Sequence, residues 1–177
     1  MLNTLMDITE AEAGMMNLQR EPVDLCQLGR EVVELYQYVA EEKKIATTTD
    51  FPAPCEVSVD RTRMRQVFAN LLDNALKYTP EGGRVTLRIQ SRNDEAIAVF
   101  RDTGIGIPFE EQDKIWTRLY RGDKSRSQRG LGLGLSLVKA VVEAHGGKIT
   151  VLSKVNEGAE FVLRLPGPVI SDRSTGR

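Results

Sequence analysis

Apolar side chains recur with the period of a helix in two segments of this chain. The two stripes are Leu25, Leu28, Val32, Leu35, Tyr36 and Val39, and then Val67, Phe68, Leu71, Leu72, Ala75 and Leu76. Asp24 and Asp60 precede these segments and can cap the two helices. A third apolar helix is expected over 133–144, where the glycine pair at 146–147 ends it.

Strand-like segments lie between and after the helices. Alternating apolar residues predict two hairpins, 85–99 with a turn at Asn93-Asp94 and 149–165 with a turn at Asn156-Glu157-Gly158. Short strands are also expected near 47–51 and 57–59. Alternation of this kind predicts an α/β (α+β) two-layer sandwich, with about three helices on one face of a mixed, mainly antiparallel sheet.

Charge and rare residues exclude several classes of function. The 177 residues carry a net charge of −1, which suggests no nucleic-acid partner. A single histidine, His145, rules out a multi-histidine metal site, and two cysteines are too few for a disulfide scaffold. The near-neutral total hides an acidic segment, 1–60, and a basic one, 114–130, which has six basic side chains against one acid. The basic segment is either a solvated charged loop or the site of an anionic partner.

Glycines gather at residues 102–106, 130–134 and 146–147. The 102–106 cluster lacks the third glycine of a dinucleotide fingerprint, because residue 109 is Phe109, and Gly147-Lys148 lacks the remaining residues of a P-loop. Gly130, Gly132 and Gly134 lie directly before the third apolar helix, where backbone N–H groups and the helix dipole favour phosphate. Because the basic segment runs into this cluster, polyphosphate is the ligand that would explain both features.

Polar residues on the 61–77 helix also indicate a nucleotide. Asn70, Asn74 and Lys77 share one face, and they offer oxygens for Mg²⁺ and a cation for phosphate. An ordinary polar surface is the alternative. Asp102 ends a strand, and its carboxylate could accept a hydrogen bond from an adenine amino group or form a simple turn.

Four ordered motifs resemble the ATP-binding catalytic domain of bacterial sensor histidine kinases, within the GHKL (gyrase, heat-shock chaperone, histidine kinase, mismatch-repair) superfamily and its Bergerat fold. They are Asn70-Leu-Leu-Asp-Asn74-Ala-Leu-Lys77-Tyr78 (N box), Asp102-Thr-Gly-Ile-Gly-Ile-Pro108 (G1 box), Ile115-Trp116-Thr-Arg118-Leu-Tyr120-Arg121 (F box) and Gly130-Leu-Gly-Leu-Gly134-Leu (G2 box). Trp116 and Leu119 depart from the phenylalanines that are usual in the F box.

The resemblance implies a role for each motif. Asn74 would ligate Mg²⁺, while Asn70, Lys77, Arg118 and Arg121 would act on the phosphates. The nucleotide contacts implied are Asn70, Asn74, Lys77, Tyr78, Asp102, Gly104, Gly106, Ile107, Tyr120, Arg121, Gly130, Leu131, Gly132, Leu133 and Gly134. The segment between the F and G2 boxes would form a mobile lid.

The resemblance also divides the chain. Residues 1–19 are expected to be the tail of the second helix of a dimerisation and phosphoacceptor hairpin, 20–166 the catalytic domain, and 167–177 a flexible tail. The acceptor histidine is absent, and His145 is expected to be structural. No segment has the ~20 apolar residues of a membrane span, and the start does not read as a signal peptide.

The implied reaction is transfer of the γ-phosphoryl group of Mg-ATP to a histidine on that hairpin, for relay to a response-regulator aspartate. The full-length protein is expected to be a homodimer whose catalytic domain is cytoplasmic, and the resemblance is compatible with a membrane-anchored parent. This chain alone is not expected to phosphorylate itself. The alternatives are a nucleotide-gated interaction module without transfer, and a serine kinase of the anti-sigma-factor type.

Overall fold

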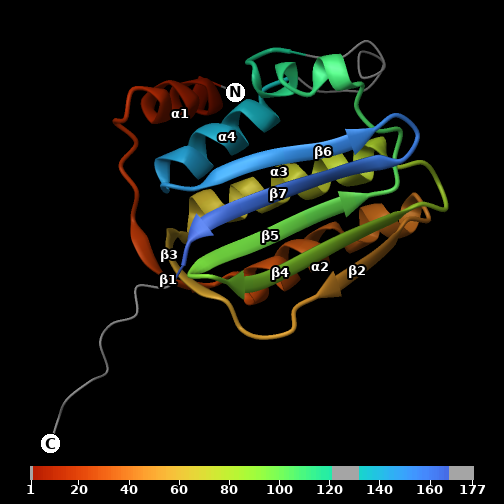
Figure 1. Ribbon diagram of the computed structural model, residues 1–177, viewed down its shortest axis with the longest axis horizontal. Helices are drawn as coiled ribbons and strands as arrows, with labels where there is room; N and C mark the ends of the chain where they lie inside the picture. The colour runs from red at the N-terminus through yellow and green to blue at the C-terminus, as the bar shows by residue number, and fades with distance from the viewer. Residues whose placement is uncertain (1, 121–131, 168–177) are drawn as a thin grey trace, which may run out of the picture.

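A computed structural model describes residues 2–120 and 132–167, and Figure 1 shows its layers. The helices are α1 (Leu2–Glu12), α2 (Leu25–Glu42), α3 (Arg61–Tyr78) and α4 (Gly134–Ala144), with short 3₁₀ turns η1 (Phe109–Glu111) and η2 (Lys114–Trp116). The strands are β1 (Arg20–Asp24), β2 (Ala46–Asp50), β3 (Glu56–Asp60), β4 (Arg84–Arg92), β5 (Glu95–Asp102), β6 (Lys148–Lys154) and β7 (Gly158–Pro166). None of the helices in the described ranges is both long and apolar enough to span a bilayer.

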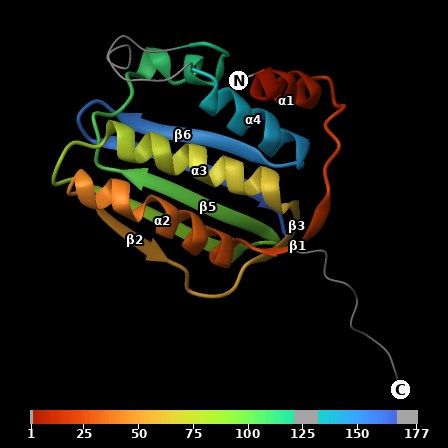
Figure 2. The ribbon, with the colours of Figure 1, turned by 180° about the vertical axis from the view of Figure 1, so that it is seen from behind.

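Five strands form the main sheet in the order β2-β4-β5-β7-β6. The β2–β4 pair is parallel, and the other three pairs are antiparallel. Helices α2, α3 and α4 cover one face, as Figure 2 shows from behind. The predicted two-layer sandwich with a mixed, mainly antiparallel sheet is therefore confirmed.

The core lies between the helices and the inner face of the sheet. Residues of the predicted α3 stripe, such as Phe68 and Leu72, are almost fully buried. Phe68 meets Phe100 of β5 edge to face, with ring centroids 5.2 Å apart. Each such apolar side chain contributes about 1.5–3 kcal/mol when it is removed from water. This packing fixes the polar face of α3 on the side away from the sheet.

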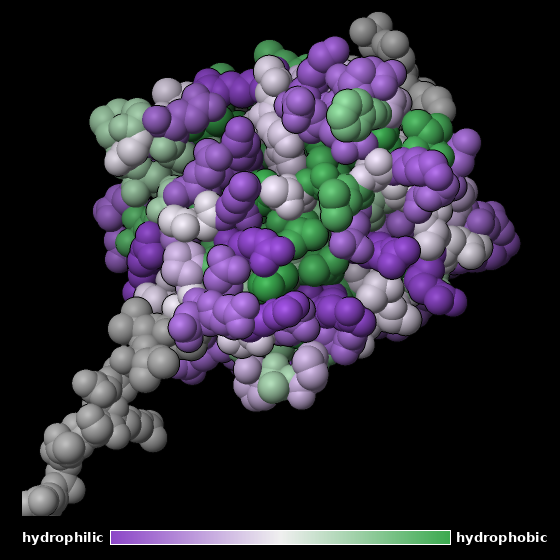
Figure 3. All heavy atoms as spheres, in the orientation of Figure 1, coloured by the Kyte–Doolittle hydropathy of each residue, from purple (hydrophilic) through white to green (hydrophobic). Residues whose placement is uncertain are grey.

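The opposite face of the sheet has no helix over it in Figure 1, and Figure 3 shows hydrophobic residues at its centre with hydrophilic residues around them. A shallow groove there is lined in part by Ile97, Val99, Leu152 and Val162. At its edge Arg164 pairs with Glu95 at 3.4 Å. None of the predicted site residues lines this groove.

Three local features differ from the expectation. The first helix ends at Glu12, before the end of the predicted hairpin-helix tail at residue 19, because Gly14 adopts a φ of 68° and Met15 N–H donates to the Glu10 carbonyl at 2.8 Å. Strand β1 was not predicted, and it pairs with β3 as a separate two-stranded sheet. No helical turn was predicted after Pro108, where the structure has the turns η1 and η2.

His145 is a buried connector between α4 and the start of α3. Its side chain is 1% exposed, and Asp60 N–H donates to Nε2 at 3.0 Å. Nδ1 therefore carries the proton and donates to the Val141 carbonyl at 2.8 Å. Burial lowers the pKa of His145, which favours the neutral ring. The structural role is supported, although the cause is burial and hydrogen bonding rather than a cation at a helix end.

Strand β1 begins at Arg20 and β7 ends at Pro166, and the catalytic-domain bounds 20–166 stay a prediction. The assignment of residues 1–19 to a phosphoacceptor hairpin stays a prediction. The predicted C-terminal tail lies, except for Gly167, outside the described residues.

Candidate functional site

Helix α3 presents the predicted N-box residues along one face. The Asp60 carboxylate caps the helix by accepting from Arg63 N–H at 3.0 Å. Four residues apart, Asn70 and Asn74 are both half-buried. Lys77, one turn further on, places Nζ 5.1 Å from the centroid of the Tyr78 ring. Two amides and a cation thus line one side of the site.

The N-terminus of α4 lies beside this face. Leu133 precedes the helix, and its side chain makes no capping bond to the first backbone N–H groups of α4. Such N–H groups at a helix start are donors that suit a phosphate. A Cβ added to Gly134 would lie 3.1 Å from Asn70 Oδ1, which shows how closely the N and G2 boxes approach. The structure therefore brings Asn70 to Gly134, with Leu133 directly before it in the chain, and places Gly132 beside Leu119 and Tyr120. Gly130 and Leu131 lie outside the described residues.

Asp102 is the buried carboxylate at the end of β5. The residue is only 6% exposed. Its Oδ1 atom accepts hydrogen bonds from Gly104 N–H at 2.7 Å and from Ala159 N–H at 3.3 Å. Burial raises the pKa of Asp102, and the two N–H donors partly oppose that effect. Both hydrogen bonds use Oδ1, which leaves Oδ2 as an acceptor for an amino group.

Close backbone contacts explain the glycines of the G1 box. A Cβ at Gly104 would meet the Tyr78 carbonyl oxygen at 2.5 Å, and one at Gly106 would meet the Lys154 oxygen at 2.0 Å. Next to them, Ile107 N–H donates to Ser153 Oγ at 2.8 Å. The turn is therefore held between the end of α3 and the β6–β7 turn, and it carries Gly104, Gly106 and Ile107 to the same region as Tyr78.

The F-box segment packs against both the core and the G2 run. Trp116 lies edge to face on Phe161 of β7, with centroids 5.9 Å apart, so the unusual residue is accommodated. Leu119 adopts a φ of 60°, uncommon for a non-glycine residue, while its N–H donates to the Gly132 carbonyl at 2.9 Å. Tyr120 lies next to Gly132, because a Cβ added to Gly132 would be 2.6 Å from the backbone carbonyl oxygen of Tyr120.

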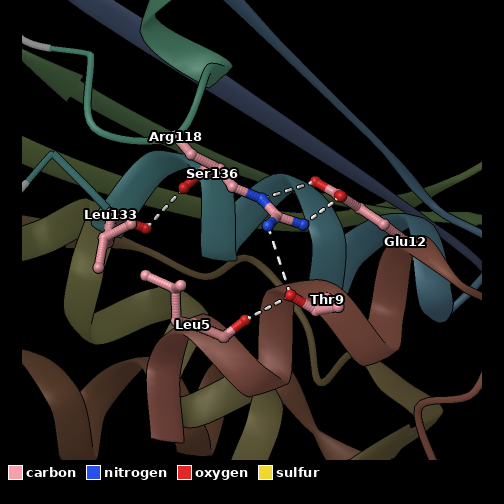
Figure 4. Close-up of polar contacts among 6 residues, drawn as sticks. All are labelled: Leu5, Thr9, Glu12, Arg118, Leu133 and Ser136. Atoms are coloured by element: carbon pink, nitrogen blue, oxygen red, sulfur yellow. Dashed lines mark hydrogen bonds and ion pairs between the residues drawn. The ribbon is translucent and has the colours of Figure 1, made fainter. Parts of the chain in front are cut away.

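The Arg118 side chain extends to α1 (Figure 4). Its guanidinium forms an ion pair with Glu12, and Nη1 donates to Thr9 Oγ1 at 3.3 Å. The predicted contact between Arg118 and the γ-phosphate stays a prediction. The predicted phosphate residue Arg121 lies outside the described residues.

Sequence reasoning missed several residues of the site. Ala159 N–H donates to the Asp102 carboxylate. Gly158 packs so closely that an added Cβ would lie 2.0 Å from the backbone carbonyl oxygen of Asp102. The sequence marked Gly158 only as part of a turn. Ser153 and Gln112 secure the G1 turn, since Gln112 Nε2 donates to the Ile107 and Ser153 carbonyls at 3.1 and 2.8 Å. Neither residue type carries a signal for such a role.

Together these groups form a site with two ends. Asp102 and the G1 turn offer a buried acceptor beside close-packed backbone, which suits a purine with an amino group. The α4 N-terminus, Asn70, Asn74 and Lys77 offer N–H donors, amide oxygens and a cation, which suit a phosphate chain and Mg²⁺. The arrangement matches a nucleoside polyphosphate.

Comparison with known sequences agrees with this geometry. Residues 59–169 match the model of the histidine kinase-, DNA gyrase B- and HSP90-like ATPase family. The adaptive-response sensory kinase SasA of Thermosynechococcus vestitus is 41% identical over 153 residues, which is 85% of this chain and 40% of SasA. The circadian input-output histidine kinase CikA of Synechococcus elongatus is 37% identical over 171 residues, 94% of this chain and 23% of CikA. The chain thus spans less than half the length of these relatives.

Solved structures share the same fold. Full-length ShkA in complex with AMPPNP superposes with a TM-score of 0.84 at 29% identity, covering 94% of this chain and 35% of ShkA. The nucleotide-free catalytic domain of the histidine kinase ThkA gives a TM-score of 0.76 at 28% identity, covering 86% and 97% of the two chains. From its residues, fold and relatives, the chain belongs to the histidine kinase-, DNA gyrase B- and HSP90-like ATPase family, with the fold of a histidine kinase catalytic domain.

Proposed function

We propose that the chain binds Mg-ATP and positions the γ-phosphoryl group for transfer to a histidine on a dimerisation hairpin. The observation that carries this function is the contact of the N box with the uncapped N-terminus of α4, at the opposite end of the site from buried Asp102. The names of the relatives, which are sensory and histidine kinases, support the reaction type.

Each group then has a part in the reaction. Asp102 accepts from the adenine amino group, and the G1 turn shapes the pocket around the base. The N–H groups of α4 and the Lys77 ammonium neutralise charge on the phosphates, which is how phosphoryl transfer is generally accelerated. Mg²⁺ would be held by the Asn74 amide oxygen, a ligand type that fits this ion, and would neutralise further phosphate charge.

The partners follow from the same reaction. The phosphorylated histidine would pass its group to a response-regulator aspartate, and the solved complex of ThkA with the response regulator TrrA supports that partnership. We place the domain in the cytoplasm of a homodimeric parent, where ATP and the regulator are available.

The test supplies the acceptor separately. The chain is incubated with γ-labelled ATP and a purified hairpin of a related histidine kinase, and label on the hairpin histidine is measured. We expect transfer only with Mg²⁺ present, and ATP binding by an Asn74→Ala variant that no longer depends on Mg²⁺. Bound nucleotide without transfer to several hairpins would instead favour a nucleotide-gated interaction module.

A further inference from the structure

The Arg118 guanidinium is held by two residues of α1. Its Nε donates to Glu12 Oε1 at 3.2 Å, and Nη2 contacts the other carboxylate oxygen, so the pair is bidentate. The Thr9 hydroxyl donates to the Leu5 carbonyl at 2.9 Å, which leaves its lone pairs to accept from Arg118 Nη1. Figure 4 shows the guanidinium between these two side chains.

A positive charge near the C-terminus of α1 would stabilise this helix. No basic residue lies in the last turn of this helix, and Glu12 places a negative charge at its already negative C-terminus. Arg118 supplies the missing charge from a segment 106 residues away. The contact therefore stabilises α1 electrostatically as well as by hydrogen bonds.

Other contacts fasten α1 in the same place. Ile8 is completely buried, and Asp7 forms an ion pair with Arg63 of α3 at 2.7 Å. The Asp7 hydrogen bond raises the pKa of Arg63. Helix α1 thus lies against the body of the domain, beside α3 and α4, the two helices that carry the candidate phosphate-binding groups.

The backbone of Arg118 also lies beside the end of the candidate site at which the phosphates are proposed to bind. The neighbouring Leu119 N–H is bonded to the Gly132 carbonyl, two residues before α4 begins. The Arg118 backbone is therefore tethered beside the α4 N-terminus while its charged group points to α1. A long arginine side chain on a fixed backbone can serve only one of these anions at a time.

From this geometry we infer that α1 and the nucleotide phosphates compete for Arg118, so that docked α1 lowers the affinity of the site for ATP. The inference rests on the proposed function, because it assigns regulation to the same nucleotide site. The structure represents the state in which α1 holds the arginine. A change that withdraws Glu12 and Thr9 releases the guanidinium to the phosphates.

Competition requires a reciprocal effect. If docked α1 weakens ATP binding, bound ATP must weaken the docking of α1 by the same factor. Because the Arg118 and Glu12 side chains are 32% and 56% exposed, salt screens the pair. An exposed pair of this kind is worth about a two- to fivefold change in affinity.

Calorimetric titration with Mg-ATP tests the inference on the whole 177-residue chain. Glu12→Gln should raise ATP affinity about two- to fivefold, whereas the matched variant Glu10→Gln, on the same helix, should not. Arg118→Ala should lower the affinity, and adding Glu12→Gln to it should then have no effect. Amide exchange should also show α1 opening faster with a non-hydrolysable ATP analogue bound.

The outcomes separate the two proposals. A wild-type chain that binds ATP with the same affinity as Glu12→Gln overturns the competition and leaves the proposed function standing. An equal gain from Glu10→Gln, or a gain that persists without Arg118, also overturns it, because the effect would then be one of general charge. A wild-type chain that does not bind ATP overturns the proposed function, and the competition falls with it.

Discussion

At the scale of single residues, Asp102 combines burial with two backbone hydrogen bonds that both use Oδ1. Burying a carboxylate is unfavourable unless hydrogen bonds compensate, and here two backbone N–H groups do so through one oxygen. The fold thus holds the carboxylate in place through Oδ1, and Oδ2 takes part in neither of these two hydrogen bonds. Such a group is expected where a ligand completes the set of hydrogen bonds.

Asp102→Asn should weaken ATP binding by about 1–3 kcal/mol, because the amide cannot accept from both backbone N–H groups and the adenine in the same way. Calorimetry with Mg-ATP measures the change. Asp73→Asn, an exposed position on α3, is the matched control and should bind like the wild type. Equal affinity of the Asp102 variant and the wild type would show that the base lies elsewhere.

Titration of His145 makes the free energy of unfolding depend on pH. Since burial lowers its pKa in the folded state, the unfolded chain binds the proton first, near pH 6.5. Stability is therefore full above about pH 6.5 and falls as the pH drops below it, by at most about 1.4 kcal/mol per pH unit. Urea unfolding at pH 7.5 and 5.5 should show this loss for the wild type.

The matched variant for this pH effect is His145→Gln, whose Oε1 can still accept from Asp60 N–H. It should be less stable than the wild type at pH 7.5 but should lose less stability on acidification to pH 5.5. The lowered pKa of Asp60 acts in a more acidic range, so it does not obscure the comparison. Parallel pH profiles for the two proteins would contradict the assignment of the effect to His145.

At the scale of elements, the G1 turn is fixed by backbone contacts. Gly106→Ala would combine a φ of 69° with a Cβ only 2.0 Å from the Lys154 oxygen. We expect both a loss of stability and a loss of ATP binding, as the turn must move away from β6. Gly82→Ala isolates the cost of φ, because Gly82 has a φ of 81° and no atom within 4 Å of an added Cβ.

The φ cost alone is about 1–2 kcal/mol, so Gly82→Ala should lose about that much in urea unfolding and keep its ATP affinity. Gly106→Ala should lose more stability and bind ATP more weakly. Equal losses in the two variants would mean that the G1 turn tolerates a Cβ and does not depend on the contact with Lys154.

The elements also show which parts of the fold the sequence could reveal. The stripes of α2 and α3 were predictable because helical periodicity is local, and the Asp60 cap was predictable for the same reason. Strand β1 was missed because only Val23 of its five residues is buried, and its stability comes from pairing with β3. The support of Asp102 by Ala159, 57 residues away, likewise depends on strand pairing that no local pattern encodes.

At the scale of the whole molecule, the uneven charge along the chain is partly compensated by ion pairs between distant segments. The acidic first sixty residues include Asp7 and Glu12 of α1, and these pair with Arg63 and with Arg118 of the basic 114–130 segment. Helix α1 is therefore attached by ion pairs and by Ile8, outside the layer formed by α2, α3 and α4. This placement divides the molecule into a sheet-and-helix body and a docked helix.

A docked helix of 11 residues should open independently of the body, because helices this short are marginal without tertiary packing. Ile8→Ala removes its fully buried side chain, at a cost of about 2–5 kcal/mol. We expect the α1 amides to exchange much faster in this variant, while protection in β5 and β7 stays at the wild-type level. Hydrogen exchange with mass spectrometry resolves the two regions.

Leu5→Ala is the control for this experiment, because Leu5 lies on the same helix and is 44% exposed. It removes the same kind of side chain without emptying the interface, so α1 should keep most of its protection. If Ile8→Ala lowered protection in β5 and β7 as much as in α1, the helix and the body would unfold as one unit. Release of α1 without loss of the body, which competition for Arg118 requires, would then be energetically inaccessible.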